Sequence, residues 1–420
     1  DSGVQWLGEI PSHWEVKRLA SYFTERRTKV SDKDYEPLSV TKNGIFPQLE
    51  NVAKTNDGDN RKLVLKDDFV INSRSDRKGS SGVSKYDGSV SLINIVLNPR
   101  SNVVPDYCNY ILKGYSFIEE YYRNGRGIVA DLWTTRYDEM KTIKICMPPI
   151  IEQQAIASYL DEATSKIDAA ISQQQKMIDL LNERKQIIIN NAVTKGLNPN
   201  VKMKDSGVDW IGEIPEGWDM VRLGYCAWIR ARLGWKGLKA DEYVDYGFPF
   251  LSAFNIKNNK LDWSELNYID KQRYDESPEI KLKVGDILLV KDGAGIGKCA
   301  RVDNLPMGES TANGSLAFIT PNERIDYRFL YYFIISDSFK KTTFNLINGM
   351  GVPHLTQGEM KKVLSPNPPI TEQNEIAEFL DIEISKVDQA IDLHLKQISL
   401  LQERKQIIIN DVVTGKVKVS

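Results

Sequence analysis

Residues 152–194 read EQQAIASYLDEATSKIDAAISQQQKMIDLLNERKQIIINNAVT, and residues 372–414 read EQNEIAEFLDIEISKVDQAIDLHLKQISLLQERKQIIINDVVT. The two stretches are identical at 25 of 43 positions, at an offset of 220 residues. Their apolar residues recur in steps of three and four, which is the spacing of a coiled-coil seam. The pattern therefore predicts two long helices whose seams are formed by Leu160, Ile167, Ile171, Ile178 and Leu181 in the first copy and by Leu380, Val387, Ile391, Ile398 and Leu401 in the second.

One seam position is polar in both copies, with Gln174 in the first and His394 in the second. Such a residue can fix the register of a helix pair, and a solvated position at a frayed seam is the alternative. We do not expect His394 to bind a metal. Each helix offers the other an apolar partner, and we expect the pairing to be antiparallel because each helix follows a globular insert of similar size. Pairing with helices of another protein stays open.

A second repeat precedes each insert. Residues 1–19 (DSGVQWLGEIPSHWEVKRL) and 205–223 (DSGVDWIGEIPEGWDMVRL) share 12 of 19 positions at an offset of 204, so the material in between is 16 residues longer in the second half. Near-identical frames around divergent inserts indicate an internal pseudo-two-fold duplication. The predicted parts are a first globular domain (1–151), a first helix (152–197), a linker with a second globular domain (198–371), a second helix (372–416) and a tail (417–420).

Composition excludes several classes of protein. The 420 residues carry a net charge of −2, which excludes DNA binding through bulk charge but not through a local face. No apolar run reaches the roughly 18 residues of a transmembrane helix, and no signal peptide is recognisable. The four cysteines have no CxxC spacing and the three histidines lie far apart, so we expect no disulfide framework, metal site or hydrolytic triad. A cytoplasmic location fits best.

Both inserts show short β-type runs between Gly, Asn, Asp and Ser clusters, which predicts mixed α+β domains. The expected strands are Lys62–Leu65, Phe69–Asn72 and Val90–Val96 in the first insert and Phe248–Ser252, Asp286–Val290 and Ser315–Ile319 in the second, where a helix over Tyr327–Thr342 follows.

One pair of loops follows corresponding predicted strands. Residues 291–298 read KDGAGIGK, which fits neither the GxGxxG nor the Walker A spacing, so a tight turn or a backbone loop close to a phosphate or DNA groove are the alternatives. Residues 73–82 read SRSDRKGSSG, whose Arg, Lys and Ser side chains suit guanines, phosphates and base edges. The candidate DNA contacts are therefore Arg74, Arg77, Lys78 and Ser80 in the first insert, and Lys291, Asp292, Gly293, Gly295, Gly297 and Lys298 in the second.

A second loop pair keeps its glycines and changes the residue between them, as NGRG at 124–127 and NGMG at 348–351. A plain turn is the alternative to DNA contact here. The candidates are Arg126, Gly349, Gly351 and the nearby His354. We interpret the aromatic residues Tyr121, Tyr122 and Trp133 as core rather than base-stacking residues. No catalytic set is recognisable in either insert, and the inserts share only turn glycines.

The order insert, helix, insert, helix resembles the specificity subunit of type I restriction–modification systems over essentially the whole chain. The motifs that carry the resemblance are DSGVxWxGEIPxxW before each insert, PPIxEQxxIAxxLD at each helix start, KDGAGIGK at 291–298 and NGMGVPHLT at 348–356; the first insert has looser versions of the last two. The resemblance implies two mixed α/β target-recognition domains joined by two long antiparallel coiled-coil helices, each domain reading one half of a bipartite site in double-stranded DNA.

The same resemblance implies the partners, namely two methyltransferase subunits and restriction subunits, with no membrane involved. S-adenosylmethionine would belong to the methyltransferase, and ATP with Mg to the restriction subunits. We therefore expect no cofactor and no catalysis in this chain. The alternatives are a coiled-coil scaffold with two protein-binding inserts and a pair of catalytic domains, and the latter would need a catalytic constellation shared by both inserts.

Overall fold

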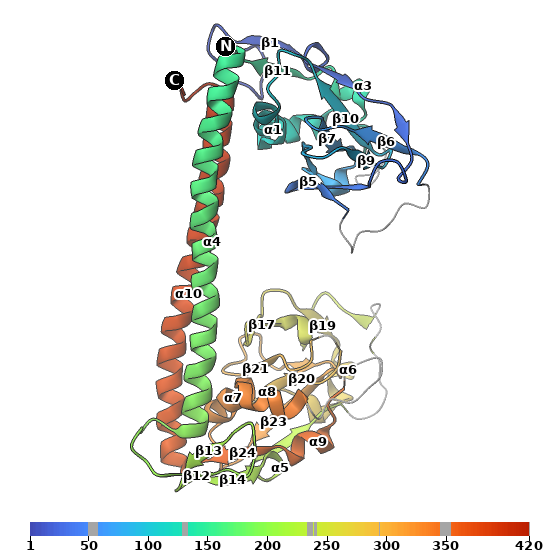
Figure 1. Cartoon of the computed structure of the whole chain (residues 1–420). Coiled ribbons are helices and arrows are strands. Elements are labelled where there is room, and N and C mark those ends of the chain that lie inside the picture. The colour runs from blue at the N-terminus through green and yellow to red at the C-terminus, as the bar shows by residue number, and fades with distance from the viewer. Residues whose placement is uncertain are drawn as a thin grey trace. The chain divides into compact units, whose positions relative to one another are not determined.

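The computed structural model describes residues 1–48, 58–127, 133–232, 238, 242–293, 295–344 and 354–419. The chain divides into two compact units, one made of Asp1–Lys176 with His394–Ser420 and the other of Met177–Leu393. Each unit contains one insert and one part of each long helix (Figure 1). This division runs through the helices, whereas the predicted boundaries separate helices from inserts; those boundaries stay a prediction.

The two long helices are α4 (Ile150–Lys195) and α10 (Ile370–Val413). Each begins directly after a Pro-Pro pair, because proline lacks the N–H that a preceding helical turn would need. Gly196, with a φ of 73°, follows the last residue of α4 and adopts the left-handed conformation that commonly terminates a helix.

The helices run antiparallel within each unit. In the first unit, Lys405 Nζ lies 2.7 Å from both carboxylate oxygens of Asp168. In the second unit, Lys185 Nζ lies 2.5 Å from Asp388 Oδ1. Because Asp168 corresponds to Asp388 and Lys185 to Lys405 in the repeat, one interhelical ion pair is formed twice. Gln174 and His394 contact each other through their side chains, so the polar seam position is paired rather than frayed.

All predicted seam residues are buried or half-buried in their units. The buried ones are Leu160, Ile167, Ile178, Leu380 and Val387. The half-buried ones are Ile171, Leu181, Ile391, Ile398 and Leu401.

In the first unit, a four-stranded sheet in the order β2-β10-β7-β8 forms the centre of the insert. Its strands are Phe23–Glu25, Asn94–Pro99, Phe69–Asn72 and Ser81–Val83. Smaller sheets pair β1 (Glu15–Arg18) with β11 (Lys144–Met147), β4 (Leu38–Thr41) with β5 (Gly44–Pro47), and β6 (Arg61–Val64) with β3 (Lys29–Val30) and β9 (Gly88–Val90). The helices are α1 (Pro105–Lys113), α2 (Tyr115–Arg123) and α3 (Tyr137–Met140).

The second unit repeats this sheet as β15-β23-β20-β21, with strands Ala227–Arg230, Leu316–Pro321, Ile287–Val290 and Cys299–Arg301. Its other sheets are β12 (Met203–Asp205) with β13 (Glu213–Pro215), β14 (Asp219–Arg222) with β24 (Leu364–Asn367), β17 (Ile256–Lys257) with β18 (Lys260–Leu261), and β16 (Phe248–Leu251) with β19 (Asn267–Ile269) and β22 (Thr311–Ala312). The helices are α5 (Leu223–Cys226), α6 (Lys271–Asp275), α7 (Tyr327–Ile335), α8 (Asp337–Phe344) and α9 (Gln357–Lys362). The predicted α+β class with paired long helices is confirmed.

Two predicted elements are wrong in detail. The run Val90–Val96 is not one strand, because a turn at Ser91–Ile93 ends β9 and starts β10 in a different sheet. The expected helix over Tyr327–Thr342 breaks at Ser336, whose extended backbone separates α7 from α8. The Ser336 hydroxyl donates to the Phe333 carbonyl and accepts from the Phe339 N–H, so it satisfies groups at the break.

The inserts share more than the turn glycines expected from the sequence. Arg26 Nε lies 2.7 Å from Asp68 Oδ2 in the first unit, and Arg230 Nη2 lies 2.8 Å from Asp286 Oδ2 in the second. Both aspartates are buried and immediately precede the central strands β7 and β20. Each also accepts a hydrogen bond from the backbone N–H three residues earlier. The shared pair is structural, since its oxygens are occupied by these contacts.

The helix-start motif fastens each insert to its helix. Trp14 Nε1 donates to Glu152 and Trp218 Nε1 donates to Glu372, both at 2.9 Å. The neighbouring Gln153 and Gln373 bridge the prolyl carbonyls before each helix to backbone N–H groups of the inserts. The hydrophobic cores are continuous across the same junctions, because α1 and α7 pack between their sheets and the long helices.

All four cysteines are free and buried, and burial raises the pKa of Cys226 to about 11 and that of Cys146 to about 12. Among the described residues there is no cluster of three or more His, Cys, Asp or Glu able to hold a metal ion. No helix in the described part of the chain has the length and apolar character needed to cross a membrane.

Candidate nucleic-acid interface

In the first unit, the predicted loop 73–82 connects β7 to β8 and contains a short 3-10 turn at Ser75–Arg77. The loop is closed at its base, because the Asn72 N–H donates to the Ser80 carbonyl and the Asn72 side-chain oxygen accepts from the Arg74 N–H. This arrangement leaves the side chains of Arg74 and Arg77 exposed.

Lys78 differs from its neighbours in this loop. Its ammonium group lies 2.7 Å from Glu119 on α2 and 5.9 Å from the centre of the Tyr122 ring. The positive charge of Lys78 is therefore used within the domain, and its prediction as a DNA contact gains no support from its position.

Arg74, Arg77 and Ser80 line one cavity of about 660 Å³, which Lys42 from the β4–β5 turn also lines. The buried residues of its lining are polar except for Leu38, and the exposed Asp76 also lines it; the polar ones are Ser39, Arg61, Asn72, Ser80 and Asn94. The Asn94 side-chain oxygen is buried without a hydrogen-bond partner among the described residues. Exposed cations around a polar interior suit contact with a phosphate backbone and with base edges.

The second predicted loop of the first insert meets the first one. Arg126 exchanges backbone hydrogen bonds with Thr134, and the Thr135 N–H donates to the Ser73 carbonyl at 3.0 Å. The Arg126 side chain is 83% exposed, with Nε 3.3 Å from Glu139. Tyr121 and Tyr122 are buried, which agrees with their interpretation as core residues.

In the second unit, residues 291–293 and 295–298 lie in the connection from β20 to β21. The Val290 N–H donates to the Lys298 carbonyl and the Gly297 N–H donates back to the Val290 carbonyl. Gly293 and Gly297 have φ values of 80° and 88°, a conformation that side chains disfavour, whereas Gly295 has ordinary space for a Cβ. The loop presents Lys298 to solvent, while Lys291 is mostly buried and lies 2.5 Å from Asp292.

The two loops of the second insert also meet. The Leu355 N–H donates to the Lys291 carbonyl at 2.9 Å, and the His354 ring contacts the Asp292 carboxylate. The candidates Gly349 and Gly351 lie outside the described residues.

The meeting points are equivalent in the two units. Thr135 bonds to the residue that follows β7, and Leu355 bonds to the residue that follows β20. Beside them, Arg74 forms an isolated bridge with Thr134, and Asp292 forms one with His354. The same backbone frame therefore presents a cation in one unit and an aspartate with a histidine in the other.

Sequence reasoning missed Lys42, Asn94 and Phe254. Lys42 lies in a Thr-Lys-Asn-Gly turn, a signal that would have marked a loop but not its neighbours. Phe254 is 61% exposed, and Lys257 Nζ lies 4.8 Å from the centre of its ring. The preceding residue, Ala253, borders the glycine loop, because a Cβ built on Gly295 would lie 3.9 Å from the Ala253 Cβ.

Comparison with known proteins connects this sequence with DNA specificity. Residues 215–402 match the family model described as type I restriction modification DNA specificity domain. The type I restriction enzyme MjaVIII specificity subunit of Methanocaldococcus jannaschii is 26% identical over 98% of this chain and 94% of its own length. The EcoKI specificity subunit of Escherichia coli K12 is 26% identical over 49% of this chain and 44% of its own.

A solved structure described as "Structural basis underlying complex assembly and conformational transition of the type I R-M system" has the same fold, with a TM-score of 0.71 at 16% identity, over 97% of this chain and 100% of that one. The family model and the relatives support a DNA sequence-recognition role for this chain. Over 98% of its length the chain is similar to a type I restriction enzyme specificity subunit, and its residues 215–402 match the type I DNA specificity domain.

Proposed function

We propose that each unit reads one half of a bipartite duplex target and that the chain directs methyltransferase and restriction subunits to that target in the cytoplasm. The observation that carries this proposal is the pair of equivalent loop junctions with unlike side chains, at Arg74–Thr134 and Asp292–His354. One frame with two different sets of reading groups suits two different half-sites.

In the first unit, the exposed Lys42, Arg74 and Arg77 contact the DNA backbone or guanine edges, while Ser80 lies deeper in the same cavity. In the second unit, Lys298 contacts a phosphate next to the glycine loop. The Asp292 carboxylate contacts Lys291 and His354 and keeps further lone pairs, so it can also accept a hydrogen bond from a cytosine amino group. Partner subunits supply the remaining phosphate contacts, which explains why a chain of net charge −2 serves this role.

The helices carry apolar surface that suits two copies of one partner. Four repeat-related positions are exposed in both units, and the fractions match closely: Ile150 42% and Ile370 45%, Tyr159 41% and Phe379 39%, Leu180 58% and Leu400 54%, Ile187 52% and Ile407 52%. Each unit holds one residue of every pair. We assign this surface to two methyltransferase subunits, because exposed apolar groups that recur at equivalent positions of both helices favour protein contact.

Catalysis belongs to these partners in the proposal. S-adenosylmethionine binds the methyltransferase subunits, ATP with Mg binds the restriction subunits, and this chain has no cofactor. The buried Arg–Asp pairs shared by the inserts are structural, so they offer no support for a pair of catalytic domains.

Methylation of a random duplex pool tests the proposal. The chain is mixed with its methyltransferase subunits, and methylated positions are mapped by sequencing. We expect one motif of two short fixed sequences whose centres lie roughly one helical turn (~34 Å) apart. Methylation of a single contiguous motif, or selectivity that persists without this chain, would contradict the proposal. Complex formation without sequence selectivity would favour the scaffold alternative.

A further inference from the structure

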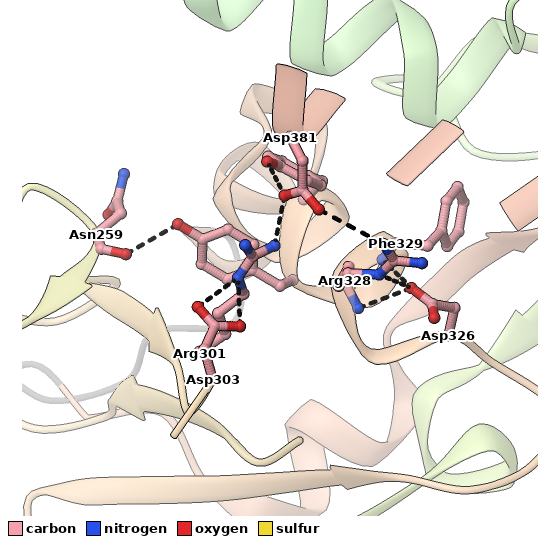
Figure 2. Close-up of polar contacts among 9 residues, drawn as sticks. Asn259, Arg301, Asp303, Asp326, Arg328, Phe329 and Asp381 are labelled. Atoms are coloured by element: carbon pink, nitrogen blue, oxygen red, sulfur yellow. Dashed lines mark hydrogen bonds and ion pairs between the residues drawn. The ribbon is translucent and has the colours of Figure 1, made fainter. Parts of the chain in front are cut away.

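In the second unit, the insert meets α10 at Asp381 of the Leu-Asp pair in the helix-start motif. Figure 2 shows three side chains converging on this carboxylate. Tyr332 of α7 donates to Oδ1 at 2.7 Å, Arg301 at the end of β21 donates to Oδ1 at 2.8 Å, and Arg328 Nη1 lies 3.6 Å from Oδ2. The three partners come from the sheet and from α7, so this one carboxylate joins both layers of the insert to the helix.

Further contacts hold these partners in place (Figure 2). Arg301 Nε lies 2.9 Å from Asp303, and its guanidinium group lies over the rings of Tyr331 and Tyr332, 5.3 Å and 5.8 Å from their centres. Burial, followed by the Asp381 contact, raises the pKa of the Tyr332 hydroxyl, so it stays a hydrogen-bond donor. With side-chain exposures of 21% for Arg301 and 28% for Asp381, the ion pair is shielded from much of the solvent.

Arg301 also links the helix to the glycine loop. The loop ends at Lys298, β21 runs from Cys299 to Arg301, and Arg301 binds Asp381. A three-residue strand spans roughly 10 Å. The loop proposed to contact DNA and the helix anchor are thus the two ends of one short strand, so motion at the anchor is transmitted directly to the loop.

The first unit lacks this link. Asp161, the repeat equivalent of Asp381, accepts a hydrogen bond from Tyr110 at 2.5 Å, and among the described residues of the first unit no arginine forms an ion pair with it. The strand register places Val83 opposite Phe69 and Arg301 opposite Ile287, so Val83 occupies the position of Arg301. The Tyr–Asp contact is common to both units, and the arginine contacts belong to the second alone.

We propose that Arg301 and Asp381 are positioning residues that hold the second reading loop at a fixed place relative to the helix pair, and thereby make the chain selective for one spacing between its half-sites. This inference rests on the proposed function. It assigns the spacing selectivity mainly to the second unit.

The test uses the complex of full chain and methyltransferase subunits on duplexes with the native spacer and with one base pair added or removed. Asp381→Asn keeps the shape of the side chain and an acceptor for Tyr332 but removes the negative charge of the ion pair. Arg301→Gln removes the positive charge of the same ion pair. We expect either variant to reduce the preference for the native spacer by about threefold to tenfold. Arg301→Lys should restore part of it, and the matched variant Asp161→Asn should leave it within about twofold.

If Asp381→Asn and Arg301→Gln weaken binding to all three duplexes equally, the ratio of the three affinities is unchanged. The role of the two residues is then purely structural, and the inference is overturned. Hydrogen exchange of the free chain provides a second readout, with faster exchange expected at residues 295–301 in Asp381→Asn and Arg301→Gln. Unchanged exchange there in both variants overturns the inference as well. If the wild-type complex shows no bipartite selectivity, the proposed function fails, and the exchange result still decides whether Arg301 and Asp381 hold the loop.

Discussion

Removing the exposed cations of the first-unit cavity should lower the salt dependence of DNA binding. Lys42, Arg74 and Arg77 line this cavity, and the three side chains are exposed. Each phosphate contact contributes about 0.9 to the slope of log affinity against log salt. Between 50 and 200 mM salt, the loss of one contact therefore reduces the salt-induced drop in affinity by about 3.5-fold, and the loss of all three by about 40-fold.

The assay is a set of fluorescence-anisotropy titrations at four salt concentrations, with Lys42→Ala, Arg74→Ala, Arg77→Ala and the triple variant bound to cognate and scrambled duplexes. Lys78→Ala is the matched control, because its ammonium group is held by Glu119 and does not line the cavity. A triple variant with the wild-type slope, or a control that loses as much slope as the single variants, refutes the placement of DNA at this cavity. An arginine that reads a base instead loses roughly 1–3 kcal/mol at one base pair of one half-site.

Four further predictions concern other parts of the chain. Lys298→Ala should lower the salt slope by about one unit on all duplexes, and no change in affinity or slope would return its loop to a plain glycine-rich turn. Inserting one heptad into each long helix should lengthen the non-specific spacer while both half-sites stay the same; a changed half-site with an unchanged spacer would show that the helices do not set the spacing. Asp286→Asn should destabilise the second unit by about 3–5 kcal/mol in urea unfolding, because it leaves the charge of buried Arg230 (4% exposed) unpaired. Glu162→Gln, which breaks an exposed pair with Lys166, should leave the stability nearly unchanged. The four cysteines should resist alkylation at pH 8 until the protein is unfolded, since they are buried with raised thiol pKa values; rapid native labelling of Cys226 or Cys146 would contradict this.

The long helices were predictable because their signal is local. Seam residues recur every three or four positions, and the proline pairs mark where each helix begins. The turn at Ser91–Ile93 was missed because Leu92 and Ile93 look like strand residues, although they are 42% and 37% exposed in the structure.

The rest depended on contacts between distant residues. Arg26 and Arg230 are 204 positions apart but their partners Asp68 and Asp286 are 218 apart, so insertions between them hide the shared ion pair. The meeting of Ser73 with Thr135, and of Lys291 with Leu355, follows from sheet packing that no local pattern encodes. The loops themselves were identified correctly as neighbours of β7 and β20, whereas which of their residues contact DNA stays a prediction.

Exchange of one insert tests whether the two units read their half-sites separately. Residues 224–370 are replaced by the corresponding insert of a related specificity subunit, and the methylated sites of the complex with methyltransferase subunits are mapped on a random duplex pool. We expect that one half-site changes, while the other half-site and the spacer length stay as in the wild type. A change in both half-sites, or in the half-site assigned to the first unit alone, would contradict it.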